Sequence, residues 1–484
     1  MSMTREMMNG TGNLIAGDMA WSGKVIETRN PSDLSDTVGV YAEGTHETAA
    51  DAVAAARHAF AKWGLSGPQK RFDMLDTAGN RLLAERDAIA LLLAREEGKT
   101  LAEAAGEVTR AAMVFKFFAG EALRPGGELL PSVRDGLTVE ITREPVGVVG
   151  LITPWNFPIA IPAWKIAAAL AFGNTIVIKP SEVAPGCAHE LARILGEAGV
   201  PAGVINLVVG SGPVVGKALV DSADVDAISF TGSVRVGRQI GADCGVSGKR
   251  VQLEMGGKNP LVVIDDADLN VAVEVAVNGS FFQTGQRCTA SSRLIVTEGI
   301  FGRFIEAVKA RMDTLRIGHA LHHETQIGPV VSERQLEQNQ RYLSIARSEG
   351  GEIHGGQMLE RATKGYFMAP ALITGTTSNM RVNREEIFGP VASVIRVKDY
   401  DEALAVANDT EFGLSSGICT TSLKYAQHFR RHVQSGLVMV NTPTAGLDYH
   451  VPFGGRKGSS YGPREQGAYA REFYSVVKTA YVSA

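Results

Sequence analysis

The sequence predicts an α/β protein with parallel sheets that are covered by helices on both faces. From residue 146 onward, short apolar runs rich in Val and Ile alternate with segments of helical periodicity, a pattern typical of such sheets. The alternation begins again after residue 257, and 484 residues are too many for one ordinary hydrophobic core. We therefore expect two α/β units, with a nucleotide site at the carboxyl ends of the strands of the first.

The region before the first predicted sheet is expected to be helical and to end in an arm. Residues 47–124 contain alanine-rich amphipathic runs such as ETAADAVAAARHAFAKW. The Gly- and Pro-marked stretch RPGGELLPSVRDGLTVEITREP follows, and its alternating LTVEITRE predicts a strand pair or an arm. Such an arm is an expected contact between subunits.

The strands are predicted at the apolar runs. The first unit has VGVVGLITP, NTIVIKP, VINLVVG, DAISFTG and KRVQLEMGG, and the second has PLVVIDD, RLIVT, ASVIRV, SSGICTT and GLVMVN. Helices fill the intervals, including one near residues 162–172, one that ends near 198 and one that ends near 282. Cys288 is thereby placed in the loop after the first helix of the second unit, where catalytic groups are commonly displayed.

Composition argues against several functions. A net charge of −4, from 48 basic and 52 acidic residues, and the lack of a dense basic block do not suggest a nucleic-acid partner. No apolar stretch is long enough to span a bilayer, and the start of the chain lacks a secretory signal. The four cysteines, Cys187, Cys244, Cys288 and Cys419, have no metal-ligand spacing. We expect a cytoplasmic protein without a metal or a disulfide framework.

Three short motifs carry candidate catalytic groups. Cys288 in FFQTGQRCTASSR is either a nucleophile or a small residue packed in a core. Asn156 in TPWNFP, held between two prolines, either aims its amide at a developing oxyanion or simply forms a turn. Glu254 in QLEMGGKNP is either a general base with a raised pKa or a buried, lysine-paired carboxylate.

Three further motifs lie where predicted strands end. In VIKPSE, Lys179 and Glu182 could hold ribose hydroxyls or be solvated charges. In FTGSVRVG, Ser233 is placed as a helix N-cap, where exposed amides could hold a phosphate or ordinary capping could operate. In VVGSGPVVG the glycines only loosely resemble a dinucleotide fingerprint and could equally serve a tight turn.

Taken together, the motifs resemble those of the aldehyde dehydrogenase superfamily over essentially the whole chain. They occur in the family's order and at its approximate spacing: PWNFP, IVIKPSE, FTGS, LEMGGK, GQRC, EEIFGP and PFGGRKGS. The resemblance implies a Rossmann-type cofactor domain, a second α/β catalytic domain and a β oligomerisation arm. The corresponding boundaries are 1–124 and 146–256, then 257–457, and finally 125–145 with the tail 458–484.

The resemblance assigns catalytic roles. Cys288 matches the nucleophile, Asn156 with the Cys288 amide matches the oxyanion hole, and Glu254 matches the base that activates water. Because only a thiolate attacks well, the site must lower the pKa of Cys288 or supply a base. Lys179 is counted among the catalytic residues as well as among the cofactor contacts.

The same resemblance implies NAD as the cofactor, with NADP as a possible second one. The carboxylate of Glu182 would repel a 2′-phosphate, which favours NAD. The family does not use the VVGSGP glycines as its phosphate cradle, although Gly212 stays among the candidate contacts. The matching positions that would contact the cofactor are Trp155, Lys179, Ser181, Glu182, Gly212, Phe230, Gly232, Ser233, Glu386 and Phe388.

The substrate is expected to be a small aldehyde. Branches of the family that pass the acyl group to coenzyme A lack the carboxylate of Glu254, so its presence favours hydrolysis to a free acid. Cations at Arg110 or Lys116 near an apolar funnel would suit a distal carboxylate on the substrate. The positions that match the family's substrate tunnel are Phe157, Ile161, Trp164, Arg287, Leu447 and Phe453.

The carboxyl-terminal run from PTAGLDYHVPFGG onward, with GQRCTA, looks most like the α-ketoglutaric semialdehyde dehydrogenases, which oxidise 2,5-dioxopentanoate. Rivals are succinate, glutarate or sulfonated semialdehydes and unspecialised aliphatic aldehydes. The succinate branch usually has arginines where this chain has Trp164 and Phe282, which weakens that assignment. His450 is either a polar group beside the substrate or a packed loop residue.

Other classes of protein fit the sequence less well. A silent structural relative would be expected to lack the nucleophile or the base, yet Cys288, Asn156 and Glu254 are all present. An unrelated NAD-binding reductase would need an acid/base pair but no cysteine. The arm and the tail ending in VVKTAYVSA resemble oligomerisation elements of the family, which implies a homodimer or a homotetramer.

Overall fold

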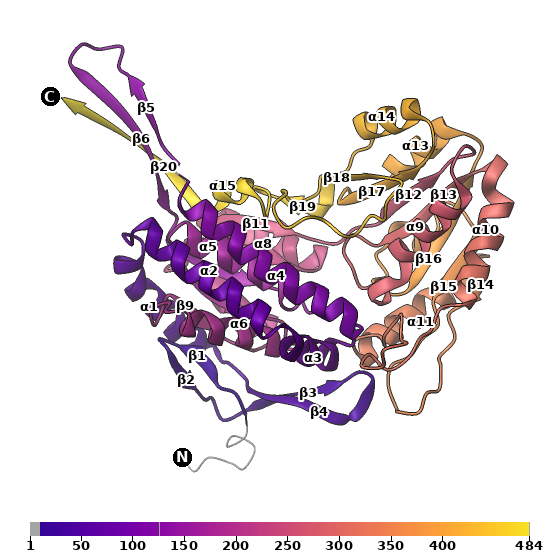
Figure 1. The fold of residues 1–484 in the computed structure, drawn as a ribbon, viewed down its shortest axis with the longest axis horizontal. Coiled ribbons are helices and arrows are strands. Elements are labelled where there is room, and N and C mark those ends of the chain that lie inside the picture. Colours follow the sequence, from indigo (N-terminus) through magenta and orange to yellow (C-terminus); the bar gives the residue numbers. More distant parts are fainter. Residues whose placement is uncertain (1–9, 125, 484) are drawn as a thin grey trace.

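The computed structural model describes residues 10–124 and 126–483, and it contains two large sheets that lie in separate halves of the molecule (Figure 1). Residues 1–9, which are part of the start of the chain from which the lack of a secretory signal was inferred, lie outside the described residues. Residue 125 of the predicted arm and residue 484 of the tail also lie outside them. Within the described part of the chain, no helix is both long and apolar enough to cross a membrane.

The first sheet has eight strands in the order β19-β11-β10-β7-β8-β9-β1-β2, of which β11 to β9 run parallel. Every strand predicted for this unit is present. The bounds are β1 Asn13–Ile15, β2 Asp18–Ala20, β7 Val148–Ile152, β8 Thr175–Lys179, β9 Ile205–Leu207, β10 Ala227–Thr231, β11 Arg250–Glu254 and β19 Ser460–Tyr461.

Helices cover both faces of this sheet because successive residues of its strands point in opposite directions. In β8, Ile176 and Ile178 join a core with α2 to α6, whereas Val177 joins a second core with α1 and α8. The predicted helical region proves to be four helices. The bounds are α1 His46–Trp63, α2 Pro68–Ala84, α3 Arg86–Glu97, α4 Leu101–Ala122, α5 Ala160–Ala171, α6 Gly186–Glu197, α7 Lys217–Asp221 and α8 Val234–Ser247.

The second sheet has seven strands in the order β14-β15-β16-β13-β12-β17-β18. Helices cover both faces of this sheet as well: Leu261 and Val263 of β12 pack with α9 and α10, and Val262 packs with α13 and α14. Its strands are β12 Asn259–Val263, β13 Ser291–Thr297, β14 Glu352–Gly355, β15 Ala371–Thr376, β16 Val391–Val397, β17 Ser415–Cys419 and β18 Leu437–Val440. Its helices are α9 Leu269–Phe281, α10 Glu298–Asp313, α11 Glu333–Ser348, α12 Arg381–Arg384, α13 Tyr400–Asn408 and α14 Leu423–His432.

The predicted arm is an antiparallel sheet of three strands, β5 Glu128–Pro131, β6 Leu137–Pro145 and β20 Ser475–Ser483, which projects beyond the first half (Figure 1). The tail reaches it through α15 Arg471–Tyr474. Before that, the tail adds β19 to the edge of the first sheet, so the described part of the tail contributes to two sheets. The domain boundaries remain predictions. Two more strands, β3 Val25–Asn30 and β4 Asp33–Ala42, form a hairpin that the sequence did not predict.

Candidate active site

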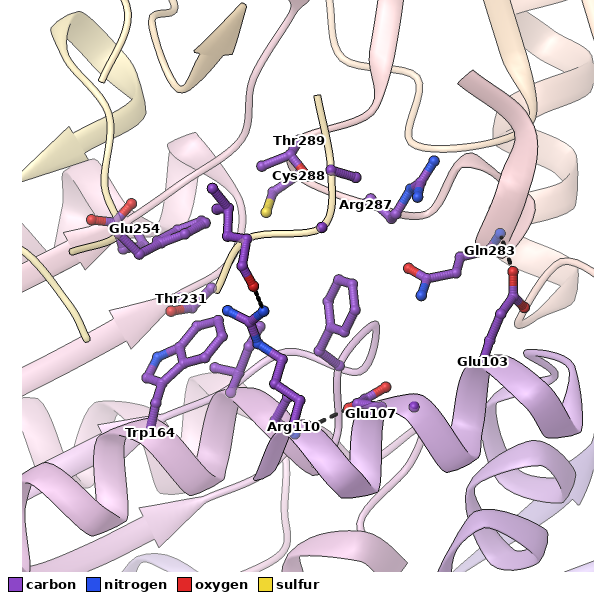
Figure 2. Close-up of a pocket in the computed structure, with 18 of the residues that line it drawn as sticks. Glu103, Glu107, Arg110, Trp164, Thr231, Glu254, Gln283, Arg287, Cys288 and Thr289 are labelled. Carbon is purple, nitrogen blue, oxygen red and sulfur yellow. Dashed lines mark hydrogen bonds between the residues drawn. The ribbon is translucent and has the colours of Figure 1, made fainter. Parts of the chain in front are cut away.

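A cavity of about 330 Å³ lies where α4 and α5, the end of β11 and the loop before β13 meet. Figure 2 shows its side chains converging from the two halves of the molecule. All six residues predicted for the substrate tunnel line it, namely Phe157, Ile161, Trp164, Arg287, Leu447 and Phe453. Cys288 and Glu254 line the same cavity.

Cys288 follows a left-handed turn. After α9 ends, Gln283, Thr284 and Gly285 have φ of 53°, 56° and 63°, a region that is costly for residues other than glycine. The Cys288 carbonyl oxygen accepts a hydrogen bond from Asn259 Nδ2 at 2.7 Å. Burial, followed by the charges of Glu386 and Glu254, raises the pKa of the thiol to about 12. The surroundings thus disfavour the thiolate and do not lower the pKa of Cys288, so a base is the remaining means of activating the thiol.

Glu254 is the last residue of β11 and is buried. Burial and the nearby Glu465 raise the pKa of the Glu254 carboxyl well above its ordinary value, against the hydrogen bond that Ser460 Oγ donates to it at 2.6 Å. No lysine forms an ion pair with Glu254 in the described part of the chain; Lys165 pairs with Glu465 instead. A carboxyl with a raised pKa beside a thiol suits general base catalysis near neutral pH.

Asn156 lies in the loop after β7 and is buried. Its Nδ2 donates a hydrogen bond to the Gln286 carbonyl oxygen at 3.0 Å, so this side chain touches the cysteine loop directly. The amide has two N–H groups, and one is left for another acceptor. The geometry therefore brings Asn156, Cys288 and Glu254 into one region, as the motifs predicted.

Apart from Glu386 and Phe388, the predicted cofactor residues lie at or after the carboxyl ends of neighbouring parallel strands. Ile152 of β7 is in register with Lys179 of β8 and with Phe230 of β10, and Thr231 of β10 is in register with Glu254. Level strand ends of a doubly wound sheet are where nucleotides bind. Lys179 is buried, not solvated, and its Nζ donates to Glu182 at 3.1 Å.

The remaining residues of these strand ends differ in exposure. Ser181 is buried, and its Oγ accepts a hydrogen bond from the Val183 amide at 3.2 Å. Gly212 and Ser233 are exposed, and Gly232 is half-buried. Ser233 occupies the N-cap position of α8, but its side chain makes no capping hydrogen bond, so ordinary side-chain capping does not account for it.

Glu386 and Phe388 come from the second half of the molecule, in the segment between α12 and β16. Glu386 Oε1 accepts a hydrogen bond from the Gly257 amide at 3.0 Å, and a side chain at Gly256 would collide with this carboxylate. Burial raises the pKa of Glu386 to about 7. The rings of Phe388 and Trp155 meet edge to face, with centroids 5.5 Å apart. These three residues thus lie beside the strand ends of the first sheet.

The candidate cations differ in position. Arg287 lines the cavity, but its Nη2 donates to the carbonyl oxygens of Asn278 and Gly279, the latter at 3.0 Å, which tethers it to α9. Lys116 does not line the cavity and pairs with Asp76 at 2.8 Å. Arg110 does line it (Figure 2). His450 is exposed and does not line it.

Among the cavity residues that were not predicted, two are charged, Glu103 and Glu107. With Arg110 they stand at intervals of four and three residues on α4, which places them on one helix face. Charged residues spaced in this way within an alanine-rich helix are the signal that could have identified them. The pattern alone does not tell whether such a face meets solvent or a cavity.

The fold and the cavity define a class of protein: a two-unit α/β protein in which a thiol and a buried carboxylate face a small-molecule cavity beside nucleotide-type strand ends. The comparisons make this specific. Residues 19–480 match the profile of the aldehyde dehydrogenase family, and the chain belongs to that family, as the motifs predicted.

Individual relatives are similar along their whole length. The chain is 43% identical over 478 residues to alpha-ketoglutaric semialdehyde dehydrogenase of Bacillus subtilis, covering 97% of each chain. It is 40% identical to 2,5-dioxopentanoate dehydrogenase of Saccharolobus solfataricus, covering 95% of this chain and 96% of that one. The crystal structure of betaine aldehyde dehydrogenase from Staphylococcus aureus in complex with NAD⁺ superposes with a TM-score of 0.96 at 33% identity, over 99% and 96% of the two chains. The predicted fold class is confirmed.

Proposed function

We propose that this protein oxidises a semialdehyde that carries a distal carboxylate, 2,5-dioxopentanoate above all, to the free acid with NAD⁺, and that NADP⁺ is a weaker alternative. The relatives named as alpha-ketoglutaric semialdehyde and 2,5-dioxopentanoate dehydrogenases support this substrate class. The observation that carries the proposal is Arg110, a cation in the wall of the cavity that also holds Cys288.

Arg110 lacks an anionic partner in the described part of the chain. Its Nη2 donates to Gln466 Oε1 at 2.9 Å and its Nη1 donates to the Leu447 carbonyl oxygen, and both acceptors are neutral. Burial lowers the pKa of Arg110, although Glu107 and Asp448 oppose this effect, and a guanidinium stays charged at neutral pH. A carboxylate on the substrate would supply the missing anion and two further acceptors.

The proposed chemistry divides the oxidation into two steps. The Cys288 thiol gives its proton to solvent water, its sulfur bonds to the aldehyde carbon, and the carbonyl oxygen becomes an alkoxide held by Asn156 and the Cys288 amide. Loss of hydride from that carbon leaves a thioester. Water activated by Glu254 then attacks the thioester carbon, the carbon–sulfur bond breaks, and the acid leaves as Cys288 regains a proton.

The level strand ends fit a dinucleotide. Lys179 and Glu182 would hold its adenosine ribose, and Ser181, Phe230, Gly232 and Ser233 would lie along the rest of the nucleotide, with Gly212 as a further candidate contact. Trp155, Glu386 and Phe388 would lie beside its nicotinamide half. When bound, the oxidised nicotinamide supplies the hydride acceptor.

The experiment is a kinetic panel with 2,5-dioxopentanoate, succinate semialdehyde, glutarate semialdehyde and hexanal, each with NAD⁺ and NADP⁺. We expect Arg110→Met to lower kcat/KM for the carboxylate-bearing substrates about 10- to 100-fold, because a charge-assisted hydrogen bond is lost, and to change hexanal oxidation less than about 3-fold. Lys116→Met, on the same helix but outside the cavity, is the matched control. Equal losses for hexanal and the semialdehydes would refute the role of Arg110.

Assembly and location are also proposals. The projecting arm supports a homodimer or homotetramer, because its exposed apolar side chains would be covered by another subunit. Four free cysteines suit the reducing cytoplasm.

A further inference from the structure

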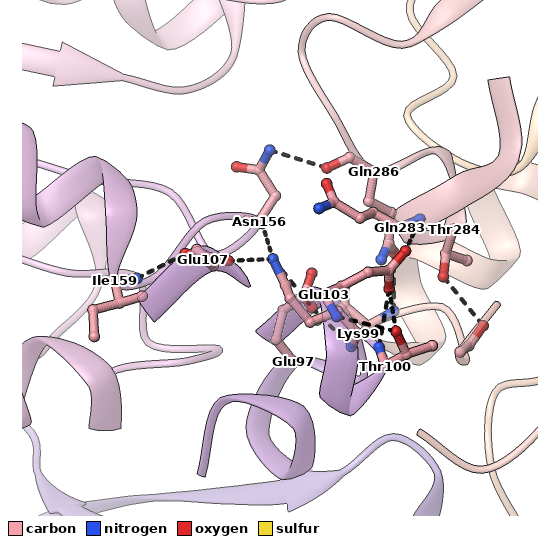
Figure 3. Close-up of polar contacts among 12 residues, drawn as sticks. Glu97, Lys99, Thr100, Glu103, Glu107, Asn156, Ile159, Gln283, Thr284 and Gln286 are labelled. Atoms are coloured by element: carbon pink, nitrogen blue, oxygen red, sulfur yellow. Dashed lines mark hydrogen bonds and ion pairs between the residues drawn. The ribbon is translucent and has the colours of Figure 1, made fainter. Parts of the chain in front are cut away.

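We propose that Lys99, just before α4, and Glu103 and Glu107, in its first two turns, act as positioning residues that hold the Asn156 loop and the cysteine loop in a fixed relation. These three side chains are called the α4 clamp. None of them was expected to contribute to the site, and two of them line the cavity wall. Figure 3 shows the clamp between the two loops.

Lys99 and Glu107 hold the Asn156 loop at two points. Lys99 Nζ donates to the carbonyl oxygen of Asn156 at 2.9 Å and to Glu107 Oε2 at 2.5 Å. Glu107 Oε1 accepts the backbone N–H groups of Ile159 and Ala160 at 3.1 and 3.0 Å. One ion pair therefore binds the loop at residue 156 and again where α5 begins.

Glu103 holds the cysteine loop. Its Oε1 accepts the backbone N–H of Gln283 at 2.9 Å. Gln283 and Thr284 have φ of 53° and 56°, and neither is glycine, so their conformation persists only where neighbouring groups impose it. Besides Glu103, the Thr284 hydroxyl fixes this turn by donating to the Gly328 carbonyl oxygen at 3.1 Å. This turn sets the direction in which the chain reaches Cys288.

The two loops meet at Asn156, whose Nδ2 donates to the Gln286 carbonyl oxygen at 3.0 Å. The direction of its second N–H therefore depends on both loops at once. An oxyanion donor works only when it is aimed in advance, and a misplacement of about 1 Å can cost about 100-fold in rate. Because Glu103 and Glu107 are one helical turn apart on a single rigid helix, the clamp fixes one loop against the other.

Burial makes this arrangement rigid. The side chains of Lys99 and Glu107 are 1% and 2% exposed. Burial opposes the charge of Lys99, but Glu107 and Glu97 outweigh it, and the pKa of Lys99 is raised above its ordinary value. Removing only one charge would leave the other buried without its main partner, so a test of this pair must neutralise both.

The first part of the test concerns the cysteine loop, and its kinetic measurement rests on the proposed function. Glu103→Ala removes the acceptor for the Gln283 N–H, and we expect kcat to fall about 10-fold or more with KM changed less than about 2-fold. The alkylation rate of Cys288 by iodoacetamide, which requires no aldehyde oxidation, should change as well. Glu103→Gln keeps an acceptor oxygen, so its kcat and its rate of Cys288 alkylation should both lie within about 3-fold of the wild-type values.

The second part of the test concerns the Asn156 loop. The double variant Lys99→Met/Glu107→Gln neutralises the buried pair, keeps an amide oxygen for Ile159 and Ala160, and removes the anchor on the Asn156 carbonyl. We expect kcat to fall about 10-fold or more, whereas the alkylation of Cys288 stays within about 2-fold, because alkylation develops no oxyanion.

Thr100→Ala is the matched control for Glu103, since Thr100 and Glu103 form the capping box of α4. It should lower stability without changing kcat or alkylation. The proposal is overturned if Glu103→Ala behaves like Thr100→Ala, if Glu103→Gln fails to rescue, or if the double variant keeps the wild-type kcat. A wild-type protein that oxidises no aldehyde would refute the proposed function, and the rate of Cys288 alkylation would still decide the role of Glu103.

Discussion

The reactivity of Cys288 is set by its surroundings and differs from that of an exposed thiol. Since burial and two carboxylates raise its pKa to about 12, we expect alkylation of the cofactor-free protein to accelerate with rising pH and to show no plateau near 8.5. Glu386→Gln removes a negative neighbour, which lowers the pKa of Cys288. At pH 9, where Glu386 is ionised, alkylation should be up to about 10-fold faster in this variant.

Peptide mass mapping after timed iodoacetamide treatment would follow this reaction, because Cys187, Cys244 and Cys419 are buried and Cys288 is only partly so. Glu385→Gln is the control, since Glu385 faces Arg381 and Tyr342 instead. A plateau near the ordinary thiol pKa in the wild type would contradict the expectation, as would equal acceleration in the two variants.

Single residues were predictable from sequence where their role depends on local backbone. Asn156 and Glu254 stand in short motifs at or just after the carboxyl ends of β7 and β11, and parallel strands bring such ends together, whereas Cys288 stands in the loop between α9 and β13. The orientation of Arg287 and Arg110 was not predictable in this way. Arg287 is adjacent to the thiol yet bonds to carbonyl oxygens of α9, whereas Arg110 reaches the cavity from a distant helix.

At the scale of elements, continuous apolar runs predicted the central strands because both faces of each sheet are buried. The hairpin of β3 and β4 was not predicted because most of its residues are half-buried or exposed and its sequence, with ETRN and SDLSDT, contains many polar residues. Short strands such as β1 and β2, three residues each, carry too little periodicity to be recognised.

The arm exposes apolar side chains that another subunit would cover. Val477 and Tyr481 of β20, which share one face of the strand, are 58% and 59% exposed. We expect Val477→Asp/Tyr481→Asp to convert the native assembly into a smaller species in sedimentation velocity, because charges cannot be buried between subunits cheaply. Arg303→Asp, at an exposed polar residue of α10, should leave the assembly unchanged. An unaltered sedimentation coefficient in the double variant would remove the arm from the interface.

For the whole molecule, the proposed nucleotide site draws on strand ends of one half and on Glu386 of the other, so a bound dinucleotide should stabilise the two halves together. At 100 times its Kd, NAD⁺ should add about 2.7 kcal/mol, which corresponds to a rise in Tm of roughly 3 °C for a chain of this size. NADP⁺ at the same concentration should give a smaller shift, because its 2′-phosphate would meet the Glu182 carboxylate that Lys179 holds at 3.1 Å.

Glu182→Gln removes that repulsion, so the NADP⁺ shift should approach the NAD⁺ shift, and the ratio of kcat/KM for the two cofactors should move toward NADP⁺ by about 10-fold. Glu190→Gln, which disturbs only a surface pair with Arg193, is the control. Thermal unfolding with each cofactor measures the shifts without relying on turnover. An equal or larger NADP⁺ shift in the wild type would show that Lys179 dominates over Glu182 and accepts the phosphate, which reverses the predicted preference.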